Sequence, residues 1–224
     1  MNEDLAQKKD RAKEIARLLD ASSPQKILFL DPSSPFRFLI QVILSAQTTD
    51  AQVLKIAPVL FETYPDVRSL AGADINKVKE IIRSTGHFNT KARHIIDCAT
   101  ILQKTYGGWI PSTMEELTAL PGVGRKTASC VLGEVYGQPV IIVDTHFGRV
   151  SQRLELVTSA RPEIIEQQMK ELLPPDMQYR FSMTLNLFGR NCCTARKPQC
   201  HNCPLYALCP WPEKLPPLYD SPHD

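Results

Sequence analysis

The chain has 224 residues, of which 43% are hydrophobic, and its formal net charge is only +2. This length can bury the core of one large domain or two small ones, and the composition excludes a disordered or fibrous protein. No apolar run approaches the roughly 18 residues of a membrane span, and residues 1–20 lack the apolar stretch of a signal peptide, so we expect a cytoplasmic protein.

Apolar residues recur at helical spacing along most of the chain, which predicts a mostly helical protein. Residues 139–143 (PVIIV) instead have the β-branched pattern of a short strand, yet no second strand is available to pair with them. Trp109 is expected to pack in a core, and the proline-rich residues 210–224 are expected to form a flexible tail. The predicted helices are residues 3–20, 35–46, 50–63, 75–84, 90–105, 113–119, 125–136, 161–173 and 178–188.

Residues 120–128 (LPGVGRKTA) form a glycine-bracketed turn between two predicted helices, the first of which Ser112 is expected to cap. Gly122 and Gly124 can adopt positive φ, and the N–H groups at a helix N-terminus attract phosphate. Lys126 lies in the first turn of the second helix, where the positive end of the helix dipole disfavours a charged ammonium. An amine that loses its proton is a nucleophile, although most lysines in such a position are ordinary surface residues.

Five of the seven cysteines fall within residues 192–209, and four of them, Cys193, Cys200, Cys203 and Cys209, form the candidate ligand set. In a reducing compartment such a group indicates metal binding rather than disulfides. Four thiolates suit either zinc or an iron–sulfur cluster. Zinc sites usually contain two closely spaced cysteine pairs and this chain has one, so the spacing favours the cluster and leaves zinc open. Cys192 lies outside the spacing.

These motifs together resemble the endonuclease III family of DNA glycosylases, over nearly the whole chain. Residues 120–128 are similar to the family's helix-hairpin-helix motif, and residues 44–50 (LSAQTTD) to its early helix. Asp144, within the sequence VDTH, follows Lys126 at the distance where the family carries its catalytic aspartate. The cysteine spacing is similar to the family's [4Fe–4S] loop.

The resemblance implies an all-α fold, the helix-hairpin-helix DNA glycosylase fold, in which two helical domains flank a cleft. One domain would be a six-helix barrel at residues 28–138, with the helix-hairpin-helix at about 113–136. The other would combine residues 1–27 with 139–209 and carry the [4Fe–4S] cluster on its four cysteines. In this fold residues 139–143 are an extended segment that delivers the aspartate to the active site.

The activity implied is that of a bifunctional DNA glycosylase and AP lyase of base excision repair, which removes oxidised pyrimidines. Lys126 would attack C1′ of the damaged nucleotide and form a Schiff base, and β-elimination would then cut the strand on the 3′ side. Asp144 would stabilise the developing oxocarbenium-like charge. Its position before Thr145 also suits a helix N-cap, and the two roles are compatible. His146 either lines the same pocket or is a structural residue.

The resemblance also indicates residues that contact DNA. Gln47 matches the family's gap-filling glutamine, and residues 85–89 match a second insertion element in which His87 replaces a leucine. Basic residues beside the two main motifs are candidate phosphate contacts, although single surface charges are usually only solvated. The candidate DNA-binding residues are Gln47, His87, Gly122, Gly124, Arg125, Arg196 and Lys197.

The partner implied is double-stranded DNA with damaged bases or abasic sites, bound by a nucleoid-associated monomer without a role for the membrane. Alternatives are a monofunctional, a pyrimidine-dimer-specific or an adenine-mismatch glycosylase, and a non-catalytic helix-hairpin-helix DNA-binding protein. Adenine-mismatch enzymes generally lack the lysine found here at Lys126, and a binding module would not need Lys126 and Asp144 together.

Overall fold

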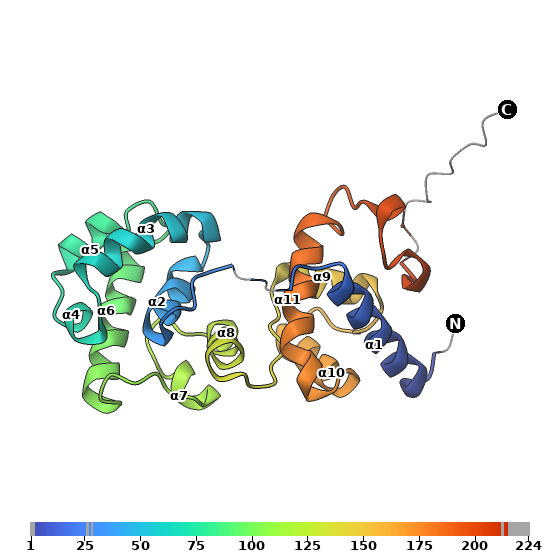
Figure 1. Ribbon diagram of the computed structural model, residues 1–224, viewed down its shortest axis with the longest axis horizontal. Coiled ribbons are helices and arrows are strands. Elements are labelled where there is room, and N and C mark those ends of the chain that lie inside the picture. The colour runs from blue at the N-terminus through green and yellow to red at the C-terminus, as the bar shows by residue number, and fades with distance from the viewer. Residues whose placement is uncertain (1–2, 26, 28, 212, 215–224) are drawn as a thin grey trace. The chain divides into compact units, whose positions relative to one another are not determined.

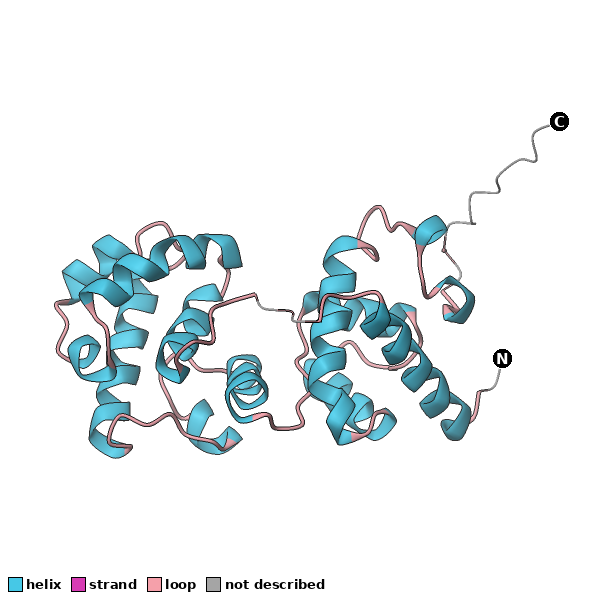
Figure 2. Ribbon diagram, viewed as in Figure 1, coloured by secondary structure: helices cyan, strands magenta, loops and turns pink. Residues whose placement is uncertain are grey.

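The computed structural model describes residues 3–25, 27, 29–211 and 213–214. This part of the chain consists of helices, turns and loops without strands (Figure 2), which confirms the all-α fold class. It forms two compact units, here called the hairpin unit (Leu28–Gln138) and the cysteine unit (Met1–Ile27 with Pro139–Asp224). No described helix is long and apolar enough to cross a membrane. Most of the predicted tail, residues 210–224, lies outside the described residues.

The hairpin unit is built around one buried helix, α2 (Figure 1). Its sequence PFRFLIQVILS is apolar almost all round, as expected for a helix packed on several sides, and α3, α6 and α8 contact it. The helices of this unit are α2 (Pro35–Ser45), α3 (Asp50–Thr63), α4 (Val67–Ala71), α5 (Ile75–Ile81), α6 (Phe88–Thr105), α7 (Met114–Thr118) and α8 (Arg125–Tyr136).

The cysteine unit packs its N-terminal helix against helices from the C-terminal half of the chain. One face of α1 is buried at helical spacing, and the rings of Phe147 and Phe181 meet edge to face at 6.0 Å in the core. Its α-helices are α1 (Leu5–Ala21), α9 (Thr145–Arg153), α10 (Pro162–Leu172) and α11 (Pro175–Asn191), followed by the short 3₁₀ helices η1 (Cys200–Asn202) and η2 (Tyr206–Leu208).

Residues 139–143 form neither helix nor strand. Val140, Ile141 and Ile142 are buried, and the Ile142 N–H donates to Ser182 Oγ at 3.0 Å. The β-branched residues therefore serve burial, and a side chain of α11 replaces the ladder partner that the strand pattern would require.

The predicted helices are present, with bounds that shift by no more than three residues. Two observed α-helices, and the two short 3₁₀ helices, were not among them. The five-residue α4 is too short to show a period and is set by a capping box between Asp66 and Ser69. The nine-residue α9 was expected only as a helix start after Asp144.

Two local predictions were wrong. The cap of α7 is Thr113 rather than Ser112, because the Glu116 N–H donates to Thr113 Oγ1 at 3.3 Å. Trp109 is 81% exposed instead of packed in a core. Trp109 follows Gly107 and Gly108, which have positive φ and turn the chain after the end of α6. The next residue, Ile110, is buried instead of Trp109.

Candidate functional site

The hairpin between α7 and α8 is anchored by apolar side chains and bent at a glycine. Leu120 and Val123 are buried, whereas Gly122 between them is exposed with φ +78°. A Cβ on Gly122 would lie only 2.9 Å from Cβ of His94 on α6. The backbone therefore passes close over α6 in a left-handed conformation that favours glycine.

Gly124 serves the hairpin differently from the prediction, since its φ of −91° is not positive. It is the N-cap of α8 and has no side chain to accept hydrogen bonds from the first-turn N–H groups. Such a helix start can receive an anion. Arg125 and Lys126 follow it and are exposed. Within the described part of the chain, the Lys126 ammonium has no hydrogen-bond or ion-pair partner.

Asp144 in the cysteine unit is held at both carboxylate oxygens. Its Oδ1 accepts from the Phe147 N–H at 2.8 Å, which makes it the N-cap of α9, and its Oδ2 accepts from Nδ2 of Asn186 on α11. Asn186 is 7% exposed, and its Oδ1 is buried without a hydrogen-bond partner among the described residues. Sequence reasoning missed Asn186 because nothing near it in the chain indicates this contact.

His146 packs within the same unit. Its Nδ1 lies 3.3 Å from Nη2 of Arg149, and a Cβ on Gly189 of α11 would lie 3.0 Å from the His146 Cβ. The same Arg149 Nη2 donates to the carbonyls of Gly189 and Cys193, at 2.8 and 3.0 Å. These contacts give His146 a packing role at the junction of α9 and α11.

The two candidate insertion residues, Gln47 and His87, belong to neighbouring turns of the hairpin unit. Both side chains are exposed, and both residues have left-handed backbones, with φ of 52° and 58°. Gln47 lies beyond Ala46, the C-cap of α2, and His87 is the N-cap of α6 without a side-chain capping bond.

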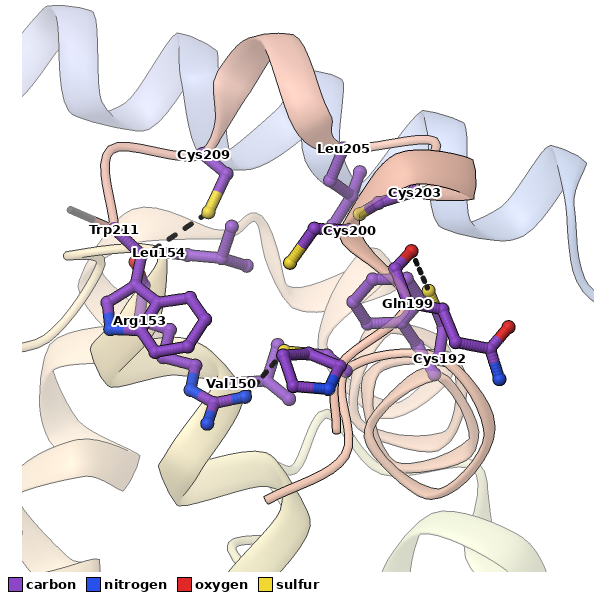
Figure 3. A pocket seen from close by; sticks show the side chains of 13 residues that line it. Val150, Arg153, Leu154, Cys192, Gln199, Cys200, Cys203, Leu205, Cys209 and Trp211 are labelled. Carbon is purple, nitrogen blue, oxygen red and sulfur yellow. Dashed lines mark hydrogen bonds between the residues drawn. The ribbon is translucent and has the colours of Figure 1, made fainter. Parts of the chain in front are cut away.

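Beyond α11, the chain folds around a small cavity lined by cysteines (Figure 3). Cys193, Cys200, Cys203 and Cys209 line it together with apolar residues that include Val150, Leu154 and Leu205. The cavity therefore offers four thiols in a shell that is mostly apolar, the donor set and surroundings of an iron–sulfur cluster. In the described part of the chain, no three His, Cys, Asp or Glu side chains are grouped so as to hold a single metal ion.

A fifth thiol, Cys192, lines the same cavity, and its Sγ lies 3.8 Å from the Gln199 carbonyl. A hydrogen bond with Cys203 lowers the pKa of Cys192. Burial raises the pKa of Cys193 and Cys209, an effect that Arg153 opposes at Cys193. Metal ligation requires thiolates, so loading of this cavity releases protons.

Arg153 of α9 braces the loop that follows Cys193. Its guanidinium donates to the carbonyls of Thr194 and Ala195 at 2.8 and 2.9 Å and lies 3.3 Å from the Cys193 Sγ. It also stacks 4.0 Å from the centroid of the Trp211 ring. The next two residues of the loop, Arg196 and Lys197, are exposed. The sequence indicated the exposed cations but not the arginine that fixes their loop.

Two family profiles match the chain. Residues 40–175 match the HhH-GPD superfamily of base excision DNA repair proteins, and residues 193–209 match the iron-sulfur binding domain of endonuclease III. Among curated proteins, endonuclease III from Synechocystis is 42% identical over 207 residues, which is 92% of this chain and 94% of the relative. Endonuclease III from Escherichia coli K12 is 37% identical over 90% of this chain and 96% of its own length. The chain belongs to the endonuclease III family within the HhH-GPD superfamily.

Solved structures agree with this assignment. A trapped covalent intermediate of endonuclease III with DNA is 36% identical, with a TM-score of 0.84, and covers 90% of this chain and 95% of its own. A thermostable thymine-DNA glycosylase is 25% identical, with a TM-score of 0.81, over 92% and 98% of the two chains. The family resemblance drawn from the sequence is confirmed, and so is the [4Fe–4S] cluster as cofactor rather than zinc.

Proposed function

We propose that this protein is a bifunctional DNA glycosylase and AP lyase that removes oxidised pyrimidines from duplex DNA and cuts 3′ to the abasic site. Two observations support the proposal. The chain shares its fold with an endonuclease III captured as a covalent DNA intermediate. The first turn after its hairpin has an exposed amine, Lys126, with no hydrogen-bond or ion-pair partner among the described residues. An amine that reacts with a sugar must be accessible and free to change its bonding.

In this proposal Lys126 is the nucleophile. Its neutral amine forms a bond to C1′ of the damaged nucleotide while the N-glycosidic bond breaks and the base leaves with a proton. The sugar ring then opens to a Schiff base with Lys126. Loss of a C2′ proton expels the 3′ phosphate, and water finally hydrolyses the Schiff base and releases the lysine.

Asp144 stabilises the positive charge that develops on the sugar. A carboxylate held at both oxygens by Phe147 and Asn186 needs no reorganisation when that charge appears, which is the condition for effective electrostatic stabilisation. We therefore include Asn186 in the proposal as the residue that orients Asp144.

The remaining site residues bind DNA and the cofactor. The N-terminus of α8, which follows Gly122 and Gly124, binds a DNA phosphate together with Arg125. The exposed side chains of Arg196 and Lys197, in the loop after Cys193, bind further phosphates. Gln47 and His87 fill the gap left by the extruded nucleotide. Cys193, Cys200, Cys203 and Cys209 ligate the cluster, whose role is structural. The protein would act as a monomer on chromosomal DNA in the cytoplasm.

Borohydride trapping tests the mechanism. The protein is incubated with a duplex that carries one oxidised pyrimidine, or one abasic site, and then reduced. We expect a covalent protein–DNA adduct that Lys126→Ala abolishes, a loss of at least about a thousandfold, because removal of a nucleophile removes the whole covalent pathway. Lys104→Ala, at an exposed lysine near the end of α6, serves as the matched control and should retain the adduct.

Other outcomes would contradict specific parts of the proposal. An adduct that persists in Lys126→Ala assigns the nucleophile to another amine. Base release without an adduct indicates a monofunctional glycosylase. Retained binding without base release or cleavage leaves a DNA-binding protein.

A further inference from the structure

The hairpin unit buries one lysine that the proposed chemistry does not use. Lys91, in the first turn of α6, is only 5% exposed. Its ammonium donates to the Leu44 carbonyl at 2.8 Å and to Thr48 Oγ1 at 2.6 Å. Both acceptors are neutral, and burial lowers the pKa of Lys91. A buried ammonium costs free energy, so its retention at this place suggests that it holds something in position.

The acceptors of Lys91 lie on both sides of one candidate insertion residue. Leu44 is in the last turn of α2, Thr48 follows the turn, and Gln47 lies between them. The ammonium therefore links the chain before Gln47 to the chain after it and holds the turn between them. Neither bond involves the Gln47 side chain, which stays exposed.

The backbone of Lys91 holds the second candidate insertion residue. Its N–H donates to the carbonyl of His87 at 3.0 Å, in the first hydrogen bond of α6. His87 is the left-handed residue that begins this helix, and its side chain is exposed. One residue thus binds the His87 turn through its main chain and the Gln47 turn through its side chain.

Two further contacts show that these turns are adjacent. A Cβ on Gly86 would lie 3.1 Å from the carbonyl of Gln47, so the backbones of the two turns touch. Beside them, Nε2 of Gln52 donates to Ser84 Oγ at 2.6 Å. The relative position of the turns is set by this contact, by the Gln52 bond and by Lys91.

The backbone conformation of both turns indicates constraint. Only three non-glycine residues in the described chain have positive φ, and Gln47 and His87 are two of them. Such residues persist where the surrounding structure determines their conformation, and they concentrate at functional sites. The Lys91 side chain bonds to the chain on both sides of Gln47 and belongs to the helix that His87 begins.

From this geometry we infer that Lys91 is a positioning residue for nucleotide extrusion, which locks the Gln47 and His87 turns in one register so that both side chains enter the emptied stack together. This inference rests on the proposed function. Lys91 touches neither DNA nor the reacting atoms. Its loss should matter where a paired, stacked nucleotide must be extruded, and should not matter where the nucleotide is already unpaired.

The test compares two substrates and two lysines. Lys91→Met keeps the length and apolar stem of the side chain but cannot donate, and Lys104→Met changes an exposed lysine of the same helix. Single-turnover cleavage is measured on a duplex with one paired oxidised pyrimidine and on a single strand with one abasic site. We expect Lys91→Met to slow cleavage of the duplex by roughly tenfold or more and cleavage of the single strand by less than about twofold. Lys104→Met should leave both rates unchanged.

A second variant keeps the inference testable if Lys91→Met folds poorly. Thr48→Val removes one acceptor and should give the same substrate pattern with a smaller effect, about threefold. Added to Lys91→Met it should cause little further loss, because the two changes remove the same bond. The fluorescence of a base analogue opposite the lesion, which reports extrusion directly, should rise less in both variants than in the wild type.

The outcomes separate this inference from the function beneath it. If Lys91→Met slows both substrates equally, or slows neither, while the wild type cleaves both, the positioning role is wrong and the proposed function stands. If the wild type forms no adduct and cleaves neither substrate, the proposed function fails and the inference fails with it.

Discussion

The two units hold their candidate site residues by different means. In the hairpin unit Gly122, Gln47 and His87 all have positive φ, so backbone conformation contributes to their placement together with the Lys91 side chain. In the cysteine unit side chains have the larger part, since Asn186 binds Asp144 and Arg153 makes three contacts with residues 193–195. A residue held by backbone conformation is disturbed by a change in φ preference, whereas a residue held by side chains is disturbed by the loss of a donor.

This contrast fits the two roles in the proposed chemistry. Lys126 has no partner in the described chain, as suits a group that must travel to a carbon atom and form a bond. Asp144 has a donor at each oxygen, as suits a group that must stay still while charge develops beside it. The proposed reaction therefore requires both a lysine that is free to move and a carboxylate that is held in place.

The largest effect is expected from a substitution among the proposed cluster ligands of the cysteine unit. Cys203→Ser removes a proposed cluster ligand, and because metal sites of this kind contribute folding free energy directly, we expect loss of the cluster and of the ordered loop that carries Arg196 and Lys197. Iron content and the yellow-brown colour of the purified protein measure this, and both should fall to near zero.

Cys192→Ser is the matched control, since Cys192 lines the same cavity but lies outside the proposed ligand set. It should retain iron and colour. The opposite result, with iron kept in Cys203→Ser and lost in Cys192→Ser, would exchange the two cysteines in the ligand assignment.

A graded pair of substitutions sharpens the account of Asp144. Asp144→Asn removes the charge and should slow base release by about 10²–10⁴-fold. Asn186→Leu keeps the charge and removes one of its two donors, so a loss of about tenfold is expected. Both losses should appear in kcat with KM nearly unchanged, because neither residue is proposed to bind the substrate in its ground state.

Single-turnover rates and thermal unfolding of the same samples separate the effects on catalysis from those on stability. Wild-type rates in a folded Asn186→Leu protein would show that the Phe147 N–H alone suffices to orient the carboxylate.

The sequence predicted those parts of the site that local sequence determines. The capping role of Asp144, the turn at residues 120–128 and the spacing of the cysteines all depend on residues a few positions apart. Asn186 bonds to a carboxylate 42 residues away, Arg153 to a carbonyl 41 residues away, and Lys91 to one 47 residues away. No local pattern encodes such distances, so the sequence indicated the residues with proposed catalytic and binding roles but not the residues proposed to position them.

Backbone conformation was only partly visible for a related reason. Gly122 and Gly124 have the same side chain and lie two residues apart, yet one has φ +78° under the constraint of His94 and the other has φ −91° in open space. The contact with α6 decides between them, and the sequence of the hairpin alone does not contain that contact.

The smallest effects are expected from substitutions of these two glycines, which should change stability in opposite directions. Gly122→Ala forces a Cβ into the left-handed region and against His94, which should destabilise the fold by about 1–2 kcal/mol and weaken DNA binding. Gly124→Ser meets open space and adds a side chain that caps α8, so it should stabilise the fold by a few tenths of a kcal/mol. The serine oxygen would nevertheless accept a hydrogen bond from an N–H group that is proposed to bind phosphate. DNA binding should therefore weaken in this variant too.

Thermal unfolding and DNA titration at one fixed salt concentration measure both quantities. Stability that moves in opposite directions while affinity falls in both variants would show that the hairpin is kept for its exposed N–H groups and not only for its fold. If Gly124→Ser binds DNA as tightly as the wild type, the first turn of α8 does not contact phosphate. Gly122 would then matter because it lets the chain pass over α6, and the cations beside the hairpin would carry the binding.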